Sequence, residues 1–85
     1  MPIISSFYGI MVVMYRSDHN PPHFHARYAE HEIEMNIRDG AWRGRMPPRA
    51  VAMLQQWRKR HIQELLEDWQ RALGDSPLLR IGPLE

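Results

Sequence analysis

The chain of 85 residues contains no cysteine, so it can form neither a disulfide framework nor a thiolate zinc site. Any metal ion would therefore have to be held by histidine and carboxylate side chains. The chain also lacks a membrane-spanning run, because its longest apolar stretch extends only from Ile10 to Tyr15. No signal-peptide pattern opens the sequence, and we expect a cytoplasmic protein without membrane contact.

Acidic residues are missing from one long stretch. Between Trp42 and Arg60 there is no Asp or Glu, although Arg and Lys recur throughout, while the whole chain has a net charge of only +1. Such a basic stretch predicts contact with phosphate or with an acidic partner, and a solvated basic face is the alternative. The candidates for phosphate or nucleic-acid binding are Arg43, Arg45 and Arg49.

What the sequence does contain is the composition of an ordinary globular protein. Hydrophobic residues make up 44% and charged residues 25% of the chain. A chain of this length supports one hydrophobic core and not two. We therefore expect residues 1–85 to form a single domain.

Four strand-like segments precede the only helical pattern. Phe7–Tyr15 is apolar on both faces, which predicts a strand covered on both sides and, in so small a domain, self-association or partner contact through it. The segments His23–Ala29 and Glu32–Ile37 are joined around Glu30-His31, and the turn signal Asp39-Gly40 leads into Ala41–Met46.

Side-chain alternation assigns the two faces of this sheet. With two-residue loops at both turns, one face is apolar and consists of Phe24, Ala26, Tyr28, Ile33, Met35, Ile37, Trp42, Gly44 and Met46. The opposite face is polar and consists of His23, His25, Arg27, Glu34, Asn36, Arg43 and Arg45. The polar face is therefore where we expect function.

A long helix should follow the sheet, from Pro48 to Leu73, with Gly74 ending it. Arg58 falls inside the apolar stripe, so either the helix bends there or the arginine buries its stem and reaches past the sheet. The tail from Leu78 to Glu85 either adds a short strand or lies over the core. The expected fold is α+β: an antiparallel four-stranded β-meander with one long C-terminal helix on one face.

The segment Asp18–His25, with the sequence Asp-His-Asn-Pro-Pro-His-Phe-His, concentrates three of the five histidines beside a carboxylate. Together with Phe7–Ile10 and Arg27-Tyr28, it resembles the signature of a bacterial family of small domains, the domain of unknown function 4160. The resemblance covers nearly the whole chain. It implies a member of a two-gene module of toxin–antitoxin type, with a small partner protein encoded nearby, and implies no catalytic residues.

Three functional hypotheses follow from the residues themselves. His23 and His25, two apart on a strand, can share a divalent metal such as Zn, Ni, Fe or Mn, with Asp18, His19 or Glu34 completing the ligands.

Alternatively, His23 and His25 act as general acid and base on RNA, with Arg27 stabilising charge and Glu34 orienting a side chain. In the third hypothesis the same face only binds a protein or nucleic-acid partner. The tryptophans Trp42, Trp57 and Trp69 are expected to pack in the core or at its edge rather than to stack on bases.

Overall fold

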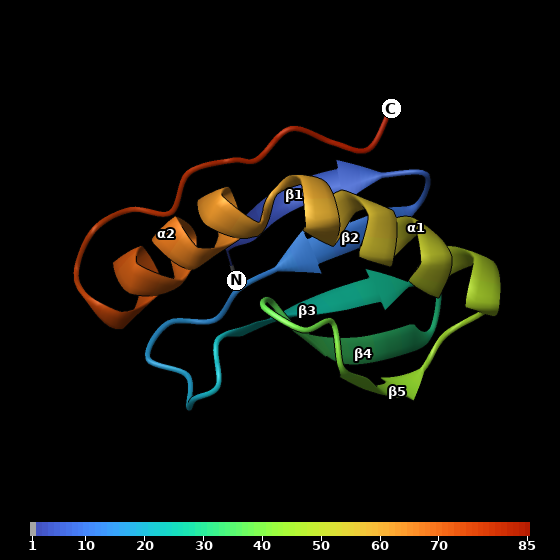
Figure 1. Cartoon of the computed structure of the whole chain (residues 1–85), viewed down its shortest axis with the longest axis horizontal. Helices are drawn as coiled ribbons and strands as arrows, with labels where there is room; N and C mark the ends of the chain where they lie inside the picture. The colour runs from blue at the N-terminus through green and yellow to red at the C-terminus, as the bar shows by residue number, and fades with distance from the viewer. Residues whose placement is uncertain (1) are drawn as a thin grey trace.

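The computed structural model describes residues 2–85 as an antiparallel sheet with two helices (Figure 1). The sheet has the strand order β1-β2-β3-β4-β5, so every strand pairs with its neighbour in sequence. The elements are β1 (Ile3–Phe7), β2 (Ile10–Val13), β3 (His23–Tyr28), β4 (His31–Asn36), β5 (Trp42–Arg45), α1 (Pro48–Arg60) and α2 (Ile62–Leu73). The α+β class and the antiparallel sheet are confirmed, whereas the expected four strands and single helix are corrected to five and two.

The extra strand arises because the expected first strand is a hairpin. Tyr8 and Gly9 have φ of 48° and 81°, which is the left-handed pair of a tight two-residue turn. Phe7 therefore ends β1 and pairs with Ile10 at the start of β2. Continuous apolar character concealed this turn, because Tyr-Gly is a weaker turn signal than Asn-Gly or Asp-Gly.

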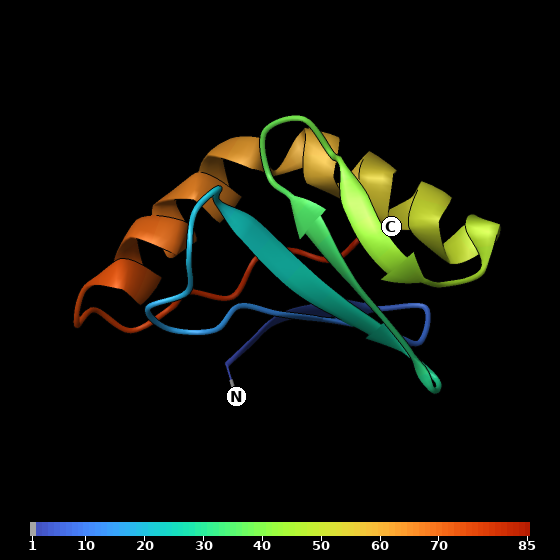
Figure 2. The same ribbon diagram turned by 90° about the horizontal axis from the view of Figure 1, so that it is seen from below.

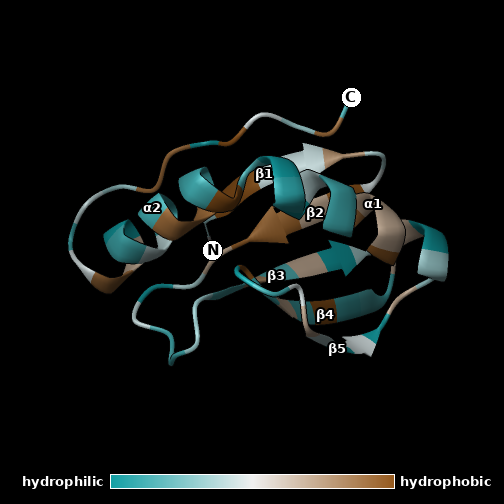
Figure 3. Ribbon diagram, in the orientation of Figure 1, coloured by the Kyte–Doolittle hydropathy of each residue, from teal (hydrophilic) through white to brown (hydrophobic). Residues whose placement is uncertain are grey.

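The faces of the sheet agree with the alternation, although the pairing register of each hairpin differs by two residues from that expected. Tyr28 pairs with His31, so the first turn is Ala29-Glu30. In the second hairpin the Asn36 N–H donates to the Ala41 carbonyl, which leaves a four-residue loop instead of a two-residue one. A shift by an even number preserves which side chains share a face. Figure 3 shows the resulting alternation of hydropathy along β3 and β4, in contrast to the uniformly hydrophobic β2.

The helical segment is broken at His61, which has a non-helical φ of −127°. Its N–H donates to the carbonyl of Arg58, so the last turn of α1 tightens before α2 begins. The two helices form one layer on the apolar face of the sheet (Figure 2). Their buried side chains include Leu54, Trp57 and Leu65, which are fully enclosed.

Arg58 is buried, with 5% of its surface exposed. Its guanidinium donates to the carbonyls of Ile37 and Arg38 at 3.0 and 3.2 Å and to the side chain of Gln55 at 3.0 Å. The arginine therefore fastens the loop after β4 to α1. Gly40 lies so close that a Cβ there would be 2.8 Å from the guanidinium.

The tail forms no strand but lies over the core, which was one of the two alternatives. The Ile81 N–H donates to the Ile4 carbonyl at 2.8 Å, and the indole N–H of Trp57 donates to the Gly82 carbonyl at 2.8 Å. Ile81 and Leu84 are buried. Among the described residues, no helix has the length and apolar character needed to cross a membrane.

Candidate functional site

The loop between β2 and β3 is fixed at both ends, which determines where its side chains lie. Ser17 donates its backbone N–H to the Ala72 carbonyl, and the Arg16 guanidinium reaches the carbonyls at the C-terminal end of α2. At the other end, the Pro22 carbonyl accepts from the Ile37 N–H at 3.0 Å. The loop therefore lies beside α2, as Figures 1 and 2 both show.

Asp18 is the centre of this site, because three imidazoles surround its carboxylate. Its Oδ2 lies 2.9 Å from His23 Nε2 and 3.4 Å from His25 Nε2. Its Oδ1 accepts from the backbone N–H of His19 at 2.9 Å and lies 2.9 Å from the ring Nδ1 of the same residue. The loop residues Asp18 and His19 thus meet the sheet residues His23 and His25 at one point.

The electrostatics of this cluster keep the carboxyl ionised. Burial alone would raise the pKa of Asp18. The backbone N–H of His19, the charge of His23 and hydrogen bonds from His25 and His23 lower it, and together they hold the pKa of Asp18 below its ordinary value.

Asp18 should therefore stabilise the metal-free protein only while it is ionised. Because its folded pKa is lower than its unfolded pKa, this contribution is complete above the ordinary carboxyl pKa of about 4 and is lost as the pH falls through the folded value. Urea unfolding of the wild type and of Asp18→Asn, from about pH 6 to about pH 3 with chelator present, measures it. The stability difference between the two should shrink below about pH 4; a pH-independent difference would contradict this.

Surrounding groups fix the orientation of both sheet histidines. His23 is 1% exposed; its Nδ1 lies 2.7 Å from the Pro21 carbonyl and its ring 5.2 Å from that of Trp69 on α2. The Asn20–Pro21 peptide bond in the same loop is cis.

His25 retains 17% side-chain exposure. Its Nδ1 faces a carboxylate oxygen of Glu32 at 3.7 Å, and Tyr15 packs edge-on against its ring.

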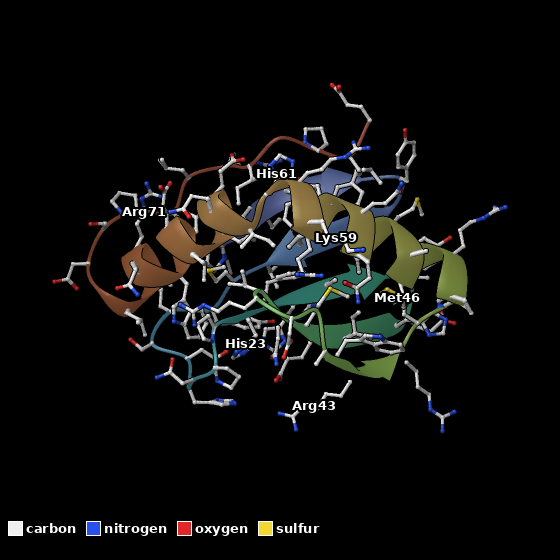
Figure 4. The ribbon with its side chains drawn as sticks, viewed as in Figure 1. His23, Arg43, Met46, Lys59, His61 and Arg71 are labelled. Atoms are coloured by element: carbon white, nitrogen blue, oxygen red, sulfur yellow. The ribbon has the colours of Figure 1, made fainter. Side chains whose placement is uncertain are left out.

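The remaining predicted residues lie at different distances from this cluster. Arg27 and Glu34 share the polar face with it; Arg27 pairs with Glu32, and Glu34 pairs with Arg43 at 3.1 Å. Figure 4 shows His23 and Arg43 on the same side of the molecule. Arg45 is exposed further along β5.

Arg49 does not join the cluster. It lies in the first turn of α1, in the layer that covers the opposite face of the sheet. Its assignment to phosphate binding stays a prediction.

A hollow of about 350 Å³ opens beside the cluster. It lies between the loop, the end of β4 and the start of β5, and its lining is His19, Asn20, Pro21, Glu34, Asn36, Ala41, Trp42 and Arg43. The described residues contain two sets whose ligand atoms all lie within 4.8 Å of one another: Asp18, His23 and His25, and His19, His23 and Glu34. His23 belongs to both sets, and the second set borders the hollow.

Sequence reasoning missed the groups that orient the histidines. Glu32 could have been found, because it alternates with Glu34 on β4 and therefore shares its face. The Pro21 carbonyl and Trp69 could not, because no local pattern shows which backbone oxygen or helix side chain will cover a ring. The exposure of Trp42, 44%, was also not expected of a packing residue.

Comparison with known proteins places the chain in a family without assigning it an activity. The model of the family described as Domain of unknown function (DUF4160) matches residues 9–70, which is more than half of the chain. No curated protein and no solved structure matches the chain.

Proposed function

We propose that this chain, which belongs to the DUF4160 family, binds a divalent transition-metal ion through Asp18, His23 and His25. The observation that carries the proposal is the orientation of His23. A carbonyl oxygen can only accept a hydrogen bond, so the contact with Pro21 requires the proton of the ring to be on Nδ1. In the neutral ring, Nε2 then presents its lone pair to the Asp18 carboxylate.

A lone pair facing a carboxylate at 2.9 Å is repulsive unless positive charge lies between them. Either a second proton or a metal ion supplies that charge. Metal-ligating histidines characteristically donate their other ring N–H to a carbonyl or carboxylate, which fixes the tautomer. His23 does so to Pro21, and the Nδ1 of His25 faces Glu32.

The spacing of the ligand atoms fits a small ion. Two ligands about 2.0–2.1 Å from zinc lie about 3.3 Å apart at a tetrahedral angle and about 2.9 Å apart at a right angle. The distances from Asp18 Oδ2 to the two Nε2 atoms, 2.9 and 3.4 Å, span these values. Two imidazoles and one carboxylate suit Zn, Fe, Ni or Mn, and such an ion would supply Lewis acidity or an activated water.

The test is metal stoichiometry on protein purified without a histidine tag. After chelation and reloading, the wild type should hold one equivalent of zinc, and His25→Gln should bind it at least about 100-fold more weakly, since it loses a direct ligand rather than an outer contact. His31→Gln is the matched control, because His31 begins β4 opposite Tyr28, at the other end of β3 from His23.

Circular dichroism must show that His25→Gln is folded, and His25 is preferred to buried His23 for that reason. Zinc binding that is equal in His25→Gln and the wild type, or absent from folded wild type, would overturn the proposal. If the folded wild type binds no zinc, the role of the cluster is to hold the loop against the sheet by hydrogen bonds.

Metal-free acid–base chemistry on RNA is the second candidate, and its support is the array of arginines on the same face. Burial weighs against it, because a ring that is 1% exposed, as in His23, cannot reach a 2′-hydroxyl. His25 could, with Arg27 beside it. RNA cleavage that persists in chelator and disappears in His25→Gln would favour this candidate over the metal.

The two-gene module of toxin–antitoxin type stays a proposal that rests on the family resemblance. Growth arrest on expression, relieved by co-expression of the neighbouring gene, would support it; neither arrest nor a stable complex would count against it. Self-association through the first hairpin is proposed with it. Such an interface would bury less apolar surface than the sequence led us to expect, because Val13 is already fully enclosed within the domain.

A further inference from the structure

The hollow beside the histidine cluster lies on its loop side, and another hollow, lined by His25, Glu32 and Arg43 among others, lies next to it over β4 and β5. Trp69 covers His23 from α2, whereas His19 and Glu34 belong to the hollow's lining. A molecule in this hollow therefore lies beside ligand atoms of this second set. Its other walls then determine what kind of molecule fits.

Those walls combine three kinds of recognition chemistry. Trp42 is an aromatic side chain with 44% of its surface exposed on the outermost strand. Asn20 and Asn36 add amides that both donate and accept hydrogen bonds. Arg43, with 75% side-chain exposure, adds a guanidinium that suits bidentate contact with phosphate.

The surroundings favour an anion over a cation or a neutral ligand. Arg38, together with Asp39, lines an adjoining hollow that shares Pro21 and Asn36 with this one. The stretch from Trp42 to Arg60 contributes no carboxylate. The single acid in the hollow is Glu34, and it is already paired with Arg43.

From these features we infer that the hollow binds a phosphate ester of a nucleoside across the edge of the sheet at β5. The phosphate lies on Arg43, which projects from the polar face, and the base lies against Trp42, which projects from the other face. Base–aromatic stacking tolerates every base, because each has a π face, and a guanidinium neutralises the phosphate beside it. The ester is either a free nucleotide or one unit of a single strand. Both present the same chemistry to the hollow.

Glu34 weakens this site. Its carboxylate pairs with Arg43 and repels an incoming phosphate. The recognition of the ester by Trp42 and Arg43 does not rest on the proposed metal site.

The experiment measures binding of a fluorescein-labelled oligouridine by anisotropy at low salt in the presence of chelator. In chelator, Trp42→Ala and Arg43→Gln should each weaken binding about tenfold, and Glu34→Gln should strengthen it several-fold. Arg60→Gln, which removes the same charge from an exposed position at the end of α1, is the control and should have little effect.

Competition identifies the source of the ester. Displacement of the label by uridine monophosphate at a similar concentration of nucleotide would assign the hollow to free nucleotides, and displacement only by unlabelled oligouridine would assign it to single strands. Equal losses in Arg43→Gln and Arg60→Gln, no loss in Trp42→Ala, or displacement only by an acidic peptide would each overturn the inference. Zinc stoichiometry measured on the same samples distinguishes failure of the nucleotide inference from failure of the proposed metal site.

Discussion

Replacement of Arg58 by methionine should lower the free energy of unfolding by about 3 kcal/mol. The guanidinium is buried against the Ile37 and Arg38 carbonyls, and methionine would fill much of the space without donating a hydrogen bond. Each bond to a charged donor contributes about 1.5–3 kcal/mol, and a buried acceptor left unpaired costs about 1–3 kcal/mol. That loss is a large share of the 5–15 kcal/mol that is typical of a whole domain.

The neighbouring residue offers a matched control for this measurement. Lys59 is exposed on α1, and Lys59→Met should change stability by less than about 0.5 kcal/mol. Arg58→Lys should recover only part of the loss, because an ammonium cannot reproduce the planar fork. Urea unfolding would measure all three, and a similar effect of the two methionine variants would contradict the role given to Arg58.

Zinc should raise the thermal midpoint of unfolding by about 10–20 °C when it is present at a hundredfold excess over its dissociation constant. A ligand that binds only the folded state at that excess stabilises it by about 2.7 kcal/mol. Each kcal/mol corresponds to about 4–8 °C in a domain of this size. The gain arises because Asp18 belongs to the loop and His25 to the sheet, so the ion joins segments that separate on unfolding.

Differential scanning calorimetry of wild type, Asp18→Asn and His31→Gln would check this expectation. The gain should disappear in Asp18→Asn and persist in His31→Gln. Magnesium should not substitute for zinc, since it prefers oxygen ligands in octahedral geometry. Equal gains in all three proteins would show that zinc binds elsewhere.

The face of each sheet residue was predictable from the sequence, whereas turns and breaks were not. Alternation requires only parity, so Phe24 and Met35 fall on the core side whichever even-numbered loop joins their strands. The turn at Tyr8-Gly9 depends on φ values that the apolar run on either side conceals. The break at His61 has no local breaker residue, because neither Gly nor Pro occurs within α1 or α2 after Pro48.

The candidate site was predictable in its members but not in its centre. His23 and His25 share a face because they are two apart on a strand, and this follows from sequence alone. The position of Asp18 depends on the contacts by which Arg16 and Ser17 fix the loop to α2. The partners of these two residues lie more than fifty residues further along the chain. Contacts at that range have no signature in a single sequence.

The proximity of Trp69 to His23 gives the domain an internal optical reporter. The two rings are 5.2 Å apart, and both are shielded from solvent. A change of charge on the imidazole, whether from a proton or from a metal ion, alters the electric field at the indole and hence its emission. Trp57 is also buried but packs against Phe7, Phe24 and the imidazole of His61. Substituting Trp57 by phenylalanine would leave Trp69 as the buried indole, and its signal would follow the state of His23 without any added label.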